Sequence, residues 1–83
     1  MRPVAPRIVG VDEIQYDGEH YKSITIGVHE YESGRPARIT RWTFTPEERA
    51  AIASGADIFV SMAGTSIPPM HLDAGWPYGP LEK

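Results

Sequence analysis

Two runs rich in β-branched and aromatic residues flank the dipeptide Asp17-Gly18 in the first half of the chain. Both central positions of a two-residue type I′ turn need φ above zero, and Asp-Gly meets that requirement at little cost. The pattern therefore predicts a β-hairpin formed by residues 7–16 and 19–32. A loop at residues 33–37 then leads into a third strand that ends at Phe44.

The register of this meander decides which side chains form the core. A two-residue turn at positions 17 and 18 places Glu13 opposite Lys22, at the end of an apolar face. Across the second hairpin, setting Val28 opposite Trp42 extends that face, whereas a shift by one residue sets Arg41 opposite Val28. We therefore expect a buried cluster of five apolar residues: Ile24, Ile26, Val28, Trp42 and Phe44.

Residues 45–55 carry the boundary signals of one short helix. Thr45 suits the N-cap position, and Glu48 can close a capping box with it. Gly55 fits the left-handed position that follows a helix C-terminus. Because so short a helix does not persist alone in water, we expect Ile52 and the small alanines to pack on the sheet.

The chain after the helix divides into a strand and an arm. Residues 57–62, Asp-Ile-Phe-Val-Ser-Met, predict a fourth, short strand. Residues 67–83 form a Pro-rich extended arm attached to a single domain at residues 1–66, and they carry too many apolar side chains for a solvated tail. The expected fold is α+β, with a three-stranded antiparallel meander, one short helix, a fourth strand and this C-terminal arm, packed on the domain or on another chain.

Composition narrows the classes of function. With 83 residues and 9.2 kDa the chain makes one modest domain. Eleven acidic against eight basic residues give a net charge of −3, so direct binding of nucleic acid is not expected. The lack of cysteine excludes disulfides, thiolate zinc sites and cysteine nucleophiles. We find no membrane-length apolar run or signal peptide, and we expect a cytoplasmic protein that does not enter the membrane.

Candidate catalytic residues do not converge in the predicted fold. His20 and His29 lie on opposite faces of one strand, so we expect no metal and no cofactor. The serines and histidines lack a nucleophile-elbow pattern, and helix capping accounts for Glu47-Glu48. Gly64-Thr65-Ser66 cannot open a phosphate-binding helix because Pro68-Pro69 follows. The sequence therefore predicts no enzyme.

A binding surface is the alternative to catalysis. Tyr, His and Arg side chains share the predicted sheet face opposite the core, and these types are enriched in interfaces. Prolines restrict the unbound arm and so lower the entropy lost when it is ordered. The candidate partner-binding residues are Tyr21, His29, Tyr31, Arg41, Met70, Leu72, Trp76 and Tyr78. The arm could instead fold back over the sheet face of its own domain and complete the core.

Three short runs resemble small uncharacterised proteins of bacteriophages and prophages. These runs are residues 42–49, Trp-Thr-Phe-Thr-Pro-Glu-Glu-Arg, residues 55–58, Gly-Ala-Asp-Ile, and residues 68–72, Pro-Pro-Met-His-Leu. Such families offer no catalytic residues to carry over. The resemblance implies a genomic setting in which small acidic proteins inhibit host defence, as anti-CRISPRs do, or serve as virion accessories or regulators.

The leading hypothesis is a non-enzymatic, phage-related protein that binds a protein partner in the host cytoplasm. An inhibitor of host defence that occupies a nucleic-acid-binding host complex would benefit from the chain's acidity. The first alternative is a virion or assembly accessory protein that forms homo-oligomers. The second alternative is a small ligand-binding protein or enzyme that uses the Tyr/His/Arg face of the sheet.

Overall fold

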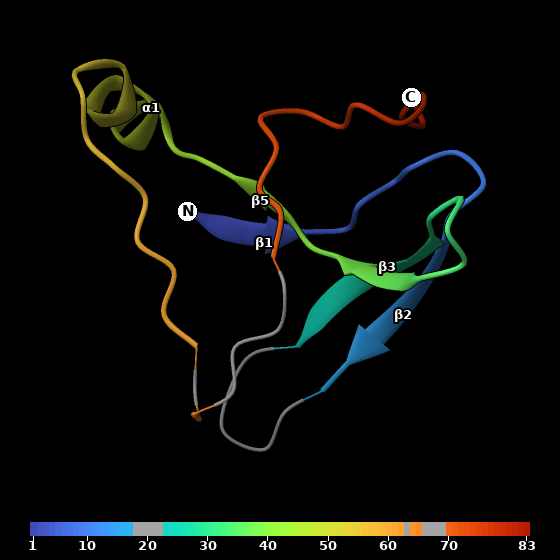
Figure 1. Cartoon of the computed structure of the whole chain (residues 1–83). Coiled ribbons are helices and arrows are strands. Elements are labelled where there is room, and N and C mark those ends of the chain that lie inside the picture. The colour runs from blue at the N-terminus through green and yellow to red at the C-terminus, as the bar shows by residue number, and fades with distance from the viewer. Residues whose placement is uncertain (18–22, 63, 66–69) are drawn as a thin grey trace.

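The fold was obtained as a computed structural model, which describes residues 1–17, 23–62, 64–65 and 70–83 (Figure 1). It has the predicted α+β class, with a three-stranded antiparallel sheet, a two-stranded sheet and one short helix. The elements are β1 (Arg2–Val4), β2 (Asp12–Tyr16), β3 (Ile24–Glu30), β4 (Pro36–Ile39), β5 (Arg41–Thr43) and α1 (Pro46–Ala53).

The meander β2-β3-β4 forms with a register other than the predicted one. Ile14 lies opposite Ile26, and Val28 lies opposite Arg38. Residues 17–23 separate β2 from β3, so a two-residue turn does not set the pairing, and Lys22 lies outside the described residues. At the start of this connection the Asp17 carboxylate accepts hydrogen bonds from the Ser23 hydroxyl and the Gln15 amide. These bonds tie the two ends of a longer loop together.

The third predicted strand is divided between two sheets at Thr40. Residues before it form β4, and residues after it form β5, which pairs antiparallel with β1. Trp42 therefore lies opposite Pro3, is 45 % exposed, and donates its indole N–H to the Thr40 hydroxyl at 3.0 Å. The predicted cluster that joined Trp42 to Val28 is wrong, because β5 pairs with β1 and not with β3.

The buried residues are few and include neighbours on opposite faces of β3, Ile26 on one face and Gly27 on the other. Ile8 and Ile26 are each 5 % exposed, and Pro6 is the largest fully buried side chain. A Cβ placed on Gly27 would lie 3.0 Å from Val11 Cγ1 and 3.5 Å from Pro6 Cγ. The missing side chain at Gly27 therefore lets the segment between β1 and β2 approach the sheet closely.

Arg7 forms a turn in the segment between β1 and β2. Its φ of 52° is in the left-handed region, which costs a non-glycine residue about 1 to 2 kcal/mol. The Arg7 backbone N–H donates to Glu13 Oε2 at 2.8 Å, and the guanidinium Nη1 lies 3.2 Å from Glu13 Oε1. Glu13 thus holds the strained turn, and it faces Gly27 across the ladder instead of the predicted Lys22.

Helix α1 begins and ends as predicted. The Thr45 hydroxyl accepts from the Glu48 N–H at 3.1 Å, and Glu48 Oε1 accepts from the Thr45 N–H at 2.9 Å. Gly55 has φ of 105°, and the bonds from Gly55 N to Ile52 O and from Ala56 N to Ala51 O form a Schellman motif. The N-terminal ammonium of Met1 also donates to the Glu48 carboxylate. These bonds satisfy groups at both ends of the helix.

The expected packing of α1 on the sheet is wrong. None of its residues is buried, and Ile52 is 38 % exposed. The predicted fourth strand is also missing, because residues 57–62 are extended chain that pairs with no strand among the described residues. Phe59 in this segment is 90 % exposed. α1 and residues 57–62 thus extend from the sheets along one side of the molecule (Figure 1).

The described part of the C-terminal arm folds back on its own chain. Leu81 forms an isolated antiparallel bridge with Ile8. The Val9 N–H donates to Pro80 O at 3.1 Å, and the Glu82 N–H donates to Arg7 O at 2.7 Å. The helix in the described part of the chain is too short to cross a membrane.

Candidate functional site

Four aromatic rings form a closed cluster where the arm meets the sheet; we call these residues, His29, Tyr31, Trp76 and Tyr78, the aromatic quartet. His29 lies 5.1 Å from Tyr31 and 5.6 Å from Trp76, measured between ring centroids. Tyr78 lies 6.1 Å from Tyr31 and 5.2 Å from Trp76. All four pairs meet edge to face, at interplanar angles from 76° to 87°. Such pairs stabilise by about 0.5 to 1.5 kcal/mol beyond the area they bury.

The sheet supplies two of these rings from the end of β3. His29 shares a face with Gly27, two positions earlier, so it lies on the covered side of the sheet. Tyr31 follows β3 and begins a tight loop, in which its N–H donates to Arg35 O at 3.0 Å and its carbonyl accepts from Gly34 N at 2.8 Å. Gly34 has φ of 81°, which glycine adopts without strain. The loop therefore fixes the backbone that carries Tyr31.

The arm supplies the other two rings. Trp76 and Tyr78 are two residues apart in irregular chain, just before the bonds that attach Pro80 and Glu82 to residues 7–9. Trp76 and His29 are half-buried, whereas Tyr78 is 56 % exposed and Tyr31 is also exposed. The quartet thus clamps the arm through its inner rings and presents the two tyrosines to solvent.

The quartet brings together four of the eight predicted binding residues and leaves the others elsewhere. Arg41 lies on β5, where its Nη1 donates to Pro6 O at 3.0 Å, so it supports the core segment. Met70 and Leu72 are exposed on the arm outside the cluster, and Tyr21 is outside the described residues.

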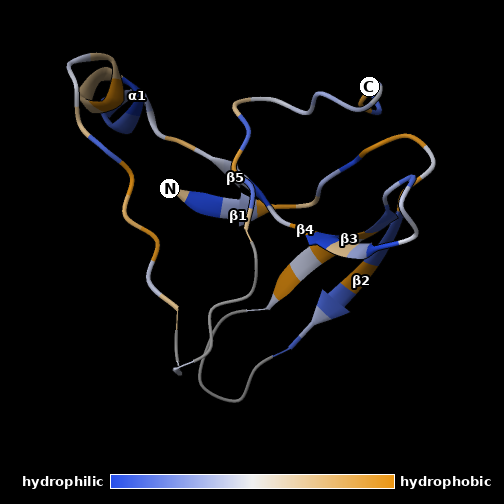
Figure 2. Ribbon diagram, viewed as in Figure 1, coloured by the Kyte–Doolittle hydropathy of each residue, from blue (hydrophilic) through white to orange (hydrophobic). Residues whose placement is uncertain are grey.

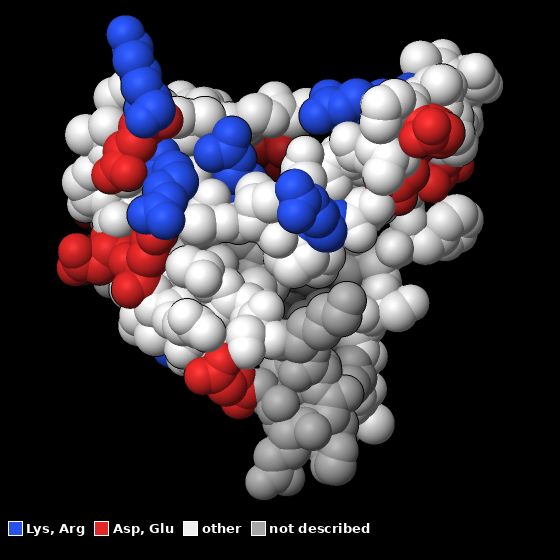
Figure 3. Space-filling model, turned by 180° about the vertical axis from the view of Figure 1, so that it is seen from behind, with Lys and Arg blue, Asp and Glu red and all other residues white. Residues whose placement is uncertain are grey.

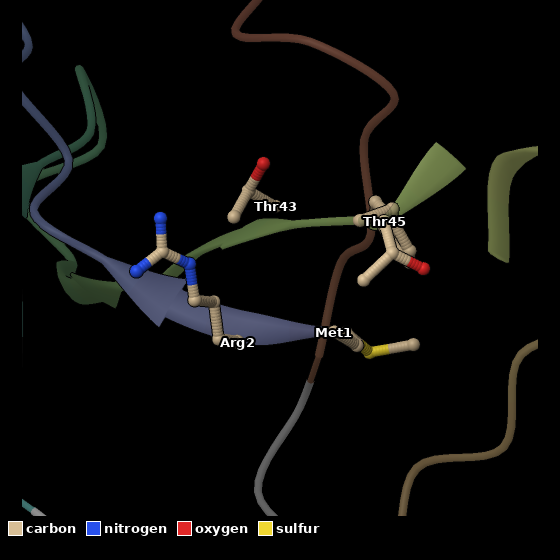
Figure 4. A pocket seen from close by; sticks show the side chains of 5 residues that line it. Met1, Arg2, Thr43 and Thr45 are labelled. Carbon is tan, nitrogen blue, oxygen red and sulfur yellow. The ribbon is translucent and has the colours of Figure 1, made fainter. Parts of the chain in front are cut away.

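A shallow depression lies where β1 and β5 meet the start of α1. Its lining residues are Met1, Arg2, Thr43, Phe44 and Thr45. In Figure 4 the Met1 and Arg2 side chains extend in opposite directions along the strand, so they do not converge on one point. The neighbouring Glu48 carboxylate has a lowered pKa, first because the N-terminal ammonium donates to it and then because the Thr45 N–H does. This ion pair already satisfies the positive end of α1.

The remaining candidates for chemistry are titratable side chains outside the quartet. Within the ranges that the structure describes, no three His, Asp or Glu side chains gather as a metal site would require. His71 Nε2 lies 3.3 Å from Asp73 Oδ1, and both belong to the exposed arm. Figure 3 shows basic and acidic side chains interspersed on the rear face. Such a mixture differs from the continuous basic surface that tracks a phosphate backbone.

A second depression, which sequence reasoning missed, lies on the outer face of the meander. It is lined by Tyr16, Ile24, Ile26, Arg38 and Thr40. The even-numbered positions of β2 and β3 share this face, and their apolar character was visible in the sequence. Only the observed register joins them, because the predicted one paired β3 with odd-numbered positions of the first strand.

No family model, no curated protein sequence and no solved structure matches this chain. The quartet and the exposed apolar surfaces are therefore the features from which a function can be inferred.

Proposed function

We propose that this chain is a non-enzymatic protein that acts by binding another protein, with the aromatic quartet at the centre of the recognition surface. The single observation that carries the proposal is the exposure of Tyr31 and Tyr78 on a clamped aromatic cluster. Tyr and Trp rings with few rotatable bonds lose little entropy on binding and often dominate binding energy. The edge-to-face contacts hold the two tyrosines in place before a partner arrives.

The quartet suits a protein partner better than a nucleic acid. Two exposed tyrosines offer apolar contact area together with hydroxyl groups that donate and accept hydrogen bonds. The chain is acidic, so a phosphate backbone would be repelled, whereas a basic protein surface would be attracted. The narrower hypothesis, an inhibitor of host defence that occupies a nucleic-acid-binding complex, rests on this acidity and on the resemblance to phage proteins.

Affinity capture with matched variants tests the proposal. The wild-type chain, Tyr78→Ala and Leu72→Ala serve as baits, and quantitative mass spectrometry compares the proteins that each one retains from a bacterial host lysate. Leu72 is an exposed apolar residue of the same arm and is not a member of the quartet. We expect a partner that is retained by the wild type and Leu72→Ala and at least tenfold depleted with Tyr78→Ala, which corresponds to about 1.4 kcal/mol.

Two controls keep this result interpretable. Circular dichroism and thermal melting must show that Tyr78→Ala retains the fold, because the ring also helps to hold the arm. A partner that binds all three baits equally well would show that the quartet only attaches the arm, and the proposal would be wrong.

A further inference from the structure

The chain exposes far more surface than a compact monomer of its size. A folded monomer of this mass exposes about 4,900 Å², whereas this chain exposes 7220 Å². The radius of gyration is 14.2 Å, against about 11.8 Å for a compact chain of this length. The excess is about 2,300 Å² for one chain and about 4,600 Å² for two, which lies within the 2,000 to 5,000 Å² that obligate dimers bury in total.

One part of the exposed apolar surface is the extended segment after α1. The apolar residues Ile58, Phe59, Val60 and Met62 are all exposed. In Figure 2 the ribbon of this segment is largely orange and lies apart from both sheets. Phe59 is the most exposed of these four side chains, at 90 %. The backbone of residues 57–62 makes no hydrogen bond to backbone elsewhere in the described residues. We call this segment, residues 57–62, the knob segment.

The other part is the outer face of the meander. Three apolar residues of this face are exposed: Ile14, Tyr16 and Val28. They lie on the same face as the depression lined by Tyr16, Ile24, Ile26, Arg38 and Thr40. A sheet with one covered face ordinarily carries polar side chains on the other. The outer face of this sheet instead carries three exposed apolar side chains beside the buried Ile26. The knob segment of the same chain lies on the far side of the molecule (Figure 1).

We propose that two copies of the chain associate about a twofold axis, with Phe59 of each copy seated in the outer-face depression of the other. A projecting aromatic residue and an apolar hollow are complementary surfaces, and a reciprocal exchange of the two closes the assembly at a dimer. Charge favours the same arrangement, because Asp57 is the first residue of the knob segment and Arg38 lines the hollow. This dimer is independent of the proposed function, since its surfaces exclude the aromatic quartet.

Sedimentation of single-site variants over a dilution series tests the dimer. We expect the wild type to have about twice the 9.2 kDa chain mass. Phe59→Asp removes the knob and Tyr16→Lys places a charge at the hollow, so each variant alone should sediment as a monomer. Leu72→Asp introduces the same charge at an exposed apolar site outside the interface, and it should remain dimeric.

Mixing the two monomeric variants tests the reciprocal contact. In the mixed pair, Phe59 of the Tyr16→Lys copy can enter the unmodified hollow of the Phe59→Asp copy. At the second contact, the carboxylate introduced by Phe59→Asp faces the ammonium introduced by Tyr16→Lys. The mixture should therefore recover the dimer mass. Because Phe59 is so exposed in one chain, its replacement should leave the circular dichroism spectrum unchanged, and Phe59→Ser replaces Phe59→Asp if that variant unfolds.

Three results would overturn the dimer. The first is a wild-type chain that stays monomeric throughout the series. The second is a dimer that persists in Phe59→Asp or in Tyr16→Lys, since another surface would then join the copies. The third is a mixture that remains monomeric although both variants are folded.

Discussion

The meander with its arm and the helix with the knob segment are stabilised in different ways. In the first region, Ile8 and Ile26 are buried and contacts join residues far apart in the chain. In the second, every residue of α1 has solvent contact, and the caps at Thr45 and Gly55 satisfy the helix ends with bonds to near neighbours. One region depends on tertiary burial and the other on local hydrogen bonding. The difference predicts how each responds to mutation.

The largest expected difference between the two regions is the response to truncation of an isoleucine. Ile8→Ala should lower the free energy of unfolding by about 2 to 5 kcal/mol, because it leaves a cavity beneath the arm. Ile52→Ala removes the same atoms from a 38 % exposed site on α1 and should cost less than about 1 kcal/mol. Urea denaturation followed by circular dichroism measures both. Equal losses would mean that α1 is packed as firmly as the core.

A smaller effect is expected when a methyl group is added at the closest backbone approach. Gly27→Ala should destabilise by about 1 to 3 kcal/mol, because its Cβ would meet Val11 Cγ1 at 3.0 Å. Gly79→Ala is the matched control, since nothing lies within 4 Å of a Cβ there. The same urea titration compares the two variants. A neutral Gly27→Ala would show that the segment over the sheet moves away without cost.

The smallest expected effect concerns acid and the helix cap. The pKa of Glu48 is lowered in the folded chain, so this carboxylate adds stability above its unfolded pKa of about 4.5 and loses it as the pH falls through the folded value. Glu48→Gln should therefore be less stable than wild type at neutral pH, and the gap should close in acid. Glu47 lies in the same helical turn but outside the capping box. Glu47→Gln is therefore the control that removes the same charge and leaves the box intact.

Thermal melting at neutral and acidic pH compares these two variants with the wild type. A gap that widens as the pH falls would contradict the assigned role of Glu48, because the sign of the linkage would be reversed. A Glu47→Gln variant with the same pH dependence would show that the overall charge of the first turn, and not the cap, carries the effect.

The helix could be predicted from sequence because its determinants are local. Thr45, Glu48 and Gly55 act on backbone groups within a few residues, so their identities specify both ends. The α+β class followed from the same contrast between strand-like runs and one helical run. Burial of Ile52 was wrong because a capping pattern reports where a helix ends and not what covers it.

The register of the meander could not be predicted from sequence, because distant contacts decide it. Gly27 of β3 lies close to Val11 and Pro6, and this approach accompanies the pairing of Gly27 with Glu13. The strand β1 was also missed, since three residues with Pro3 at the centre carry little strand signal. Because β1 pairs with β5, Trp42 lies opposite Pro3 and not in the predicted core.

The quartet was predicted in part. Residue type alone nominated His29, Tyr31, Trp76 and Tyr78, since aromatic residues on a sheet face and on a proline-rich arm suggest contact surfaces. Their meeting in one cluster depends on the path of the arm over residues 7–9, which no local pattern specifies. Arg41 was nominated with them, but the division of the third strand at Thr40 moves it to β5.

The bridge between Ile8 and Leu81 has a consequence for synthesis on the ribosome. Ile8 precedes its bridge partner Leu81 along the chain, so it emerges long before residue 81 has left the exit tunnel. Helix α1 is complete once Ala56 has emerged, whereas Ile8 stays without its contact to the arm until translation reaches residue 81. In that interval chaperones that recognise apolar segments have access to Ile8.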